Sequence, residues 1–128
     1  INPGTGRAID AAARRPWLGN VQGGLSGPAI KPIALLKVRE VHEVAARHRV
    51  PIIGQGGIVS ARDAIEFLIA GATAIGIGTA LFYDPMVCKK VNAGIADYLR
   101  AHGLRSVGEL TGSLRIGRDS PDTACAGG

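Results

Sequence analysis

Apolar residues recur every three or four positions in three segments of the chain, the spacing that gathers them on one face of an α-helix. The pattern predicts helices over residues 30–48, 61–70 and 85–102. The buried face of the first is expected to carry Ala34, Val38, Val41 and Ala45. The buried face of the third is expected to carry Val87, Val91, Ile95 and Tyr98.

Two short β-branched runs alternate with these helices. "VPIIG" at residues 50–54 and "TAIGIG" at residues 73–78 are too brief for helices and predict strands. The first strand, a short apolar run bounded by Pro51 and Gly54, is expected to be buried on both faces, as in a parallel sheet. Strands and helices in this order form parallel βαβ units, so the two strands should be adjacent.

Two α/β folds are built from such units: an open doubly wound sheet and a (β/α)8 barrel. A dinucleotide-binding doubly wound sheet carries the pattern G-x-G-x-x-G after its first strand. The stretch "GQGGIVSARD" lacks the third glycine at that spacing, and no acidic residue ends the following strand. The sequence therefore favours part of a (β/α)8 barrel.

Local signals mark the ends of the predicted elements. Ser60 and Asp63 resemble a capping box that opens the second helix, and Gly71 suits its C-terminal end. Asp84, followed by a proline, is expected to cap the start of the third helix. Residues 1–27 are rich in turn-forming residues and predict a small hairpin or a long loop.

Glycines gather where the two predicted strands end. Gly56 and Gly57 follow the first strand, and Gly78 with Thr79 follows the second. Backbone N–H groups at two adjacent strand ends can cradle a phosphate, because no Cβ blocks its approach. Barrels often bind a phosphate in this way with a short extra helix, which "ALFYD" would supply. The alternative is that these glycines only permit tight turns.

Composition argues against several classes of function. The 128-residue chain has a net charge of +5, but its basic residues are scattered and aromatic residues make up 4%, so nucleic-acid binding is not expected. No apolar run reaches the roughly 18 residues of a membrane span. Cys88 and Cys125 lack the spacing of metal ligands. With no initiating Met and no signal-peptide pattern, the chain is interpreted as a piece of a longer cytoplasmic protein.

Several stretches together resemble a known family. "NVQGGLSGPAIKPIAL" at residues 20–35 is the most specific, with "RAID" before it and "IIGQGGI" and "GATAIGIGTA" after it. From Ile1 to about Leu114 the chain is similar to the catalytic subunits of class 1B dihydroorotate dehydrogenases. The resemblance implies that residues 1–114 are the C-terminal portion of an FMN-binding (β/α)8 barrel, and that residues 115–128 are a disordered tail.

The resemblance also implies site residues. Contacts to FMN are expected at Ile1, Gly27, Gly56, Gly57, Gly78 and Thr79. Asn2 matches an asparagine that binds the pyrimidine substrate. Pro3 stands where the family typically has threonine, and proline offers neither a hydroxyl nor an N–H. One substrate hydrogen bond of the family is therefore not expected here.

For the whole protein, the resemblance implies FMN-dependent oxidation of dihydroorotate to orotate in de novo pyrimidine biosynthesis. It further implies an oligomer and a partner subunit with FAD and an iron–sulfur cluster, which passes electrons to NAD. The family's catalytic base is a cysteine on an upstream loop, and a lysine near the flavin also lies upstream. No catalytic residue is therefore expected in this chain, which should be inactive alone.

The remaining reactive side chains receive structural interpretations. Cys88 is expected to be a buried structural thiol within the third helix. Lys31 should position a helix start or face solvent, while Asp63 and Glu66 should be surface acids without a partner. Two other functions stay open: a dihydropyrimidine dehydrogenase-type flavin barrel, and a barrel that binds a sugar phosphate without redox chemistry.

Overall fold

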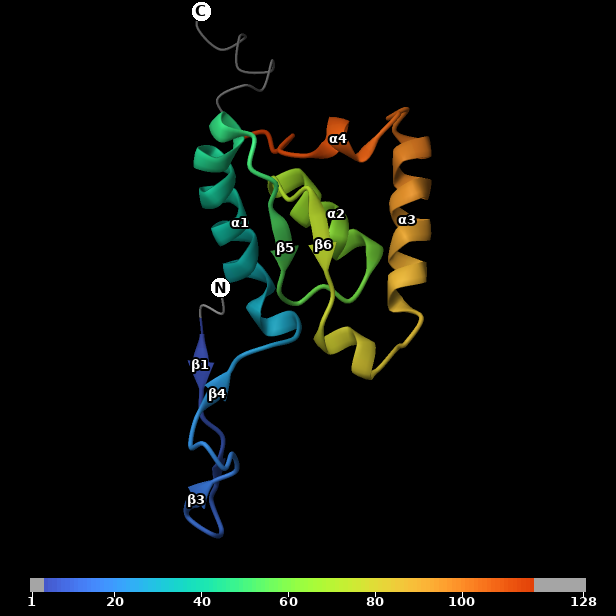
Figure 1. Cartoon of the computed structure of the whole chain (residues 1–128). Helices are drawn as coiled ribbons and strands as arrows, with labels where there is room; N and C mark the ends of the chain where they lie inside the picture. The colour runs from blue at the N-terminus through green and yellow to red at the C-terminus, as the bar shows by residue number, and fades with distance from the viewer. Residues whose placement is uncertain (1–3, 117–128) are drawn as a thin grey trace, which may run out of the picture.

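The computed structural model describes residues 4–116, which form a hairpin arm and an α/β body (Figure 1). In the arm, β1 (Thr5–Gly6) pairs antiparallel with β4 (Gly23–Gly24), and β2 (Ile9–Asp10) pairs antiparallel with β3 (Arg15–Pro16). The arm projects away from the body at the end where the short helix η3 (Thr79–Phe82) lies. Of the two possibilities predicted for residues 1–27, a small hairpin or a long loop, the described residues 4–27 form the hairpin.

The body is built around β5 (Ile53–Gln55) and β6 (Ala74–Gly76), which pair in parallel as predicted. Both strands are shorter than expected. The first begins at Ile53 because Pro51 has no N–H, and because the N–H of Ile52 donates to the hydroxyl of Thr73 at 2.9 Å.

Only one face of this strand pair is covered in the described residues. Gly54 is buried against α2, whereas Ile53 is 64% exposed on the opposite face. Figure 1 shows that the helices pack around only one side of the strand pair. The expectation that the strand at residues 50–54 is buried on both faces is therefore wrong for this chain.

The helices follow the predicted segments closely. They are η1 (Pro28–Ile30), α1 (Lys31–Ala45), η2 (Ala46–His48), α2 (Ala61–Ala70), η3 (Thr79–Phe82), α3 (Val87–Ala101) and α4 (Val107–Leu110). The capping box of α2 is formed, and Gly71 ends that helix with a φ of +128°. The third helix begins later than predicted, at Val87, because the Asp84 carboxylate accepts the N–H of Met86 and closes a turn before it.

The core lies between α2 and the strand pair and is extended by α1 and α3. Ala64, Phe67 and Ala72 are fully buried. From α1 it receives Ala34 and Val38, and from α3 it receives Val87 and Val91.

Two further predictions about burial are wrong. Val41 is 42% exposed, so the apolar face of α1 is narrower than its sequence pattern. Cys88 is exposed rather than buried, because it follows Val87 and the helical turn carries it off the buried face. None of the helices within residues 4–116 is long and apolar enough to cross a membrane.

We predict that Gly54→Ala destabilises the body. The backbone there accepts alanine, but an added Cβ would lie 2.8 Å from Phe67 Cδ1 and 2.9 Å from the Cβ of Ala72. Overpacking of this kind costs about 1–3 kcal/mol, so Tm in a thermal melt should fall. In the control Gly108→Ala, the added Cβ meets only Ser106, at an ordinary 3.5 Å. Equal Tm values for the two variants would contradict a tight contact between β5 and α2.

Candidate functional site

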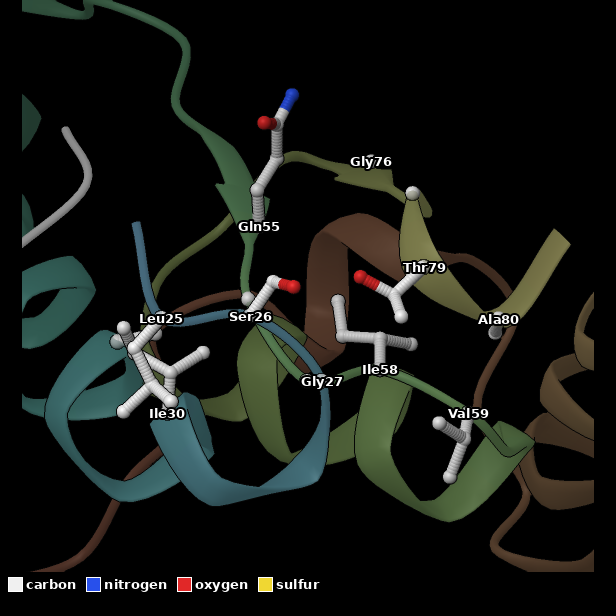
Figure 2. A pocket seen from close by; sticks show the side chains of 14 residues that line it. Leu25, Ser26, Gly27, Ile30, Gln55, Ile58, Val59, Gly76, Thr79 and Ala80 are labelled. Atoms are coloured by element: carbon white, nitrogen blue, oxygen red, sulfur yellow. The ribbon is translucent and has the colours of Figure 1, made fainter. Parts of the chain in front are cut away.

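A pocket of about 190 Å³ opens where β5 and β6 end (Figure 2). Three segments line it: the turn before α1, the turn after β5 and the turn after β6. Its lining consists of Leu25, Ser26, Gly27, Ile30, Ala34, Gln55, Gly56, Gly57, Ile58, Val59, Gly76, Gly78, Thr79 and Ala80. The pocket thus joins three segments that are far apart in the sequence.

Left-handed backbone conformations shape two of these turns. The φ angles are +80° at Gly27, +123° at Gly56 and +75° at Gly57, a region that residues with a Cβ rarely adopt. A Cβ on Gly56 would also lie 2.8 Å from the Cβ of Ala34. These turns therefore require glycine for the shape of the pocket wall itself.

Gly57 and Gly78 play different parts in the pocket. A Cβ on Gly57 would lie 2.7 Å from the carbonyl oxygen of Gly27 and 2.9 Å from the Cβ of Lys31, so the turn after β5 rests directly on the start of α1. The tight-turn interpretation therefore holds for Gly57 whatever ligand binds. At Gly78, by contrast, an added Cβ would have no atom of the described residues within 4 Å, apart from its chain neighbours.

The pocket offers hydrogen-bond donors, and among residues 4–116 no charged side chain lines it. Within residues 4–116, the backbone N–H groups of Gly57 and Gly78 donate no hydrogen bond to the protein. In Figure 2 the hydroxyl groups of Ser26 and Thr79 are turned toward each other across the pocket. This arrangement suits an anion bound by neutral donors that are fixed before it arrives.

Most of the predicted FMN residues come together here. Gly27, Gly56, Gly57, Gly78 and Thr79 all line the pocket. Ile1 and Asn2, like Pro3, lie outside the described residues.

Sequence reasoning missed two polar side chains of the lining, Ser26 and Gln55. Each stands next to a predicted glycine, so adjacency to the turns was the available signal.

A four-membered ionic cluster lies beside the pocket, and its exposed member Arg62 places Nε 3.4 Å from Glu66 Oε1. The Nζ atom of Lys31 is 2.6 Å from Asp63 Oδ1 and 2.7 Å from Glu66 Oε2. The other oxygen of Asp63 accepts hydrogen bonds from the N–H of Val59, the N–H of Ser60 and the Ser60 hydroxyl. Lys31 does begin α1, but the expectation that the two acids lack a partner is wrong, because the fold brings α2 against the start of α1.

The contacts within this cluster keep both Asp63 and Lys31 charged. Burial favours a higher pKa for the Asp63 carboxyl, but hydrogen bonds from Lys31, Ser60 and Val59 outweigh burial and hold that pKa below its ordinary value of 3.8. Hydrogen bonds to Asp63 and Glu66 raise the pKa of Lys31 above its ordinary 10.5. The ion pair is therefore intact across the whole neutral range.

The other reactive side chains form no comparable site. Tyr98 and His102 stack at the end of α3 with ring centroids 3.9 Å apart. Among the described residues, no group of three or more His, Cys, Asp or Glu side chains is placed to hold a metal ion.

Comparison with known sequences identifies relatives. The family model described as dihydroorotate dehydrogenase matches residues 1–99. The dihydroorotate dehydrogenase B (NAD(+)) catalytic subunit of Geotalea daltonii is 56% identical over 116 residues, which are 91% of this chain and 37% of that protein. The protein of the same name from Phocaeicola vulgatus is 52% identical with the same coverage. The chain thus spans 37% of the length of these relatives.

Solved structures of DHODH also superpose on this chain. Ligand-free DHODH from Eimeria tenella superposes with a TM-score of 0.66 at 30% identity, over 71% of this chain and 25% of that chain. The complex of Eimeria tenella DHODH with ferulenol gives a TM-score of 0.67 at 26% identity, over 84% of this chain and 29% of that chain.

We predict a pH-dependent cost for Asp63→Asn. The folded-state pKa of Asp63 is lowered, so the stability that its charge contributes is present above 3.8 and is lost as the pH falls through the folded-state value. Near neutral pH the substitution should lower the free energy of unfolding by about 2 kcal/mol. The difference between wild type and variant, measured by urea unfolding, should shrink below pH 3.8. A difference that stays constant into that acid range would contradict a charged Asp63.

Proposed function

The chain belongs to the dihydroorotate dehydrogenase family, and from this premise we propose that it supplies the part of a flavin-dependent dihydroorotate dehydrogenase that binds the FMN phosphate. The whole enzyme would oxidise dihydroorotate to orotate in pyrimidine biosynthesis. The observation that carries the proposal is the pocket in which three glycine-bearing turns meet at the end of a parallel strand pair.

We further propose that residues 1–114 belong to a (β/α)8 barrel in which β5, α2, β6 and α3 are consecutive βα units. The uncovered face of the strand pair supports this. Ile53 and Ala74 lie opposite each other and are exposed there, whereas Gly54 is buried toward α2. In a closed barrel the helices cover the outer face and apolar side chains fill the interior, which would bury Ile53.

The residues present fit the phosphate of FMN. The free N–H groups of Gly57 and Gly78 and the hydroxyls of Ser26 and Thr79 would hold its oxygens. Gly27 and Gly56 would give the turns their shape, and Ile1 would make a further contact. When bound, FMN supplies the acceptor for the hydride taken from the substrate.

The chain's own part is binding and placement. We propose no catalytic residue within it; the base would come from another part of the enzyme. Electrons would leave through a partner subunit with FAD and an iron–sulfur cluster toward NAD, in a cytoplasmic oligomer. The names of the relatives support dihydroorotate rather than a dihydropyrimidine or a sugar phosphate as the substrate.

Gly78→Ala in the full-length protein should weaken FMN binding about tenfold, or about 1.4 kcal/mol. Gly78 lines the pocket and its added methyl group clashes with no protein atom, so the loss should come from space taken from the ligand. Gly57→Val is a poorer test, because its side chain would strike Gly27 and Lys31 and would disturb the fold with or without a ligand.

The measurement is the Kd of FMN, from the fluorescence change of the flavin on binding, together with Tm. Gly108→Ala is the matched control, since it also adds one methyl group but lies in α4, away from the pocket. Wild-type FMN affinity in a folded Gly78→Ala protein would place the phosphate elsewhere.

Asn2→Ala should weaken turnover of the substrate without weakening binding of the cofactor. We propose that the side-chain amide of Asn2 pairs with the edge of the pyrimidine ring, so kcat/KM for dihydroorotate should fall about tenfold or more while bound FMN stays at the wild-type level. Steady-state kinetics with dihydroorotate and the flavin absorbance of the purified enzyme give the two values. Unchanged kinetics would remove Asn2 from the substrate site.

A further inference from the structure

We propose that Lys31 and Asp63, assisted by Glu66, form a positioning bridge that holds two turns of the pocket in the geometry that binds FMN. The inference rests on the proposed function and adds residues that the resemblance left without a role. None of the three lines the pocket. They act by holding in place the glycines that line the pocket.

Asp63 fixes the turn that follows β5. One of its carboxylate oxygens, Oδ2, accepts hydrogen bonds from Val59 N–H at 3.1 Å, from Ser60 N–H at 2.9 Å and from the Ser60 hydroxyl at 2.7 Å. Asp63 is only 8% exposed, so these bonds lie largely out of water. Val59 itself lines the pocket, two residues after Gly57, so the carboxylate sets the path of this wall.

Lys31 ties that turn to the one before α1. It is the first residue of α1, and its N–H donates to the carbonyl of Pro28 just after Gly27. Its Nζ reaches the remaining oxygen of Asp63, while its Cβ lies 2.9 Å from where a Cβ of Gly57 would be. Lys31 therefore links the two turns: its backbone N–H bonds the turn before α1, while its stem lies against the turn after β5 and its charge meets the carboxylate that holds that turn.

An ion pair suits positioning better than it suits stability. The side chains of Lys31 and Asp63 are 24% and 12% exposed, so each has lost much of its hydration. In such a setting desolvation offsets much of the attraction, and the net gain in folding free energy is small. The pair instead restrains the position of the start of α1 relative to α2. Lys31 Nζ has to meet two carboxylates, at 2.6 and 2.7 Å, which leaves little freedom for that helix end.

The test compares two lysines of α1 in the full-length protein. Lys31→Met removes the charge but keeps the stem that packs on Gly57, and Asp63 retains its bonds from Val59 and Ser60. The Kd of FMN should rise about tenfold, the effect of one charge-assisted hydrogen bond. Lys37→Met is the matched control, because Lys37 makes only an exposed ion pair to the neighbouring turn of its own helix.

Two further variants separate positioning from stability. Lys31→Arg keeps the charge and should restore most of the FMN affinity. Leu110→Ala removes a buried side chain of α4, away from the pocket, and serves as a destabilised reference. Lys31→Met should weaken FMN binding well beyond Leu110→Ala even if both variants lower Tm equally.

Wild-type FMN affinity in Lys31→Met, or a loss no greater than that of Leu110→Ala, would overturn the positioning role. If Gly78→Ala still weakened binding in that case, the proposed FMN site would stand and only the bridge would fall. A wild-type protein that binds no FMN would instead overturn the proposed function itself.

Discussion

The close contact between the turn at Gly57 and the start of α1 is the constraint on which the site depends. The two segments come so near that any Cβ on Gly57 would collide with the carbonyl of Gly27. Asp63 holds one side of this contact through Ser60, and Lys31 holds the other. Because the contact is fixed by the protein itself, the N–H donors of the pocket are in place before a ligand arrives, which lowers the cost of binding.

The choice of donors matches the ligand that we propose. A phosphate held by backbone amides and hydroxyls needs no cation in the pocket, and the lysine nearest to it is neutralised by Asp63 and Glu66. The charge of Lys31 is thus compensated by carboxylates of the protein itself. The proposal separates two tasks: the glycines would contact the ligand, and the ion pair behind them would keep the glycines in position.

Local patterns in the sequence predicted the local structure well. The capping box of Ser60 and Asp63 and the three helices depend on residues a few positions apart, so spacing alone reveals them. The glycines after two parallel strands also predicted the pocket, because parallel strands end at the same edge. The resemblance contributed Gly27, which no periodicity marks.

Several failures share one cause, which is contact between distant segments. Lys31 and Asp63 are 32 residues apart, so their pairing follows from tertiary packing and not from any local motif. The sequence left Gly57 open between a ligand contact and a tight turn, because the close approach of Gly27, with which an added Cβ would clash, arises only in the fold. The exposure of Cys88 depends on how α3 is rotated against the core, which an apolar stripe only roughly defines.

A crystal structure of the full-length protein grown with FMN measures the central claim directly, as the distances from the phosphate oxygens to the amide nitrogens of Gly57 and Gly78. The account predicts that the phosphate lies between the three turns, with both nitrogens at hydrogen-bond distance, about 2.7–3.2 Å. A phosphate bound outside this pocket, or held by charged side chains while both amides stay free, would contradict it.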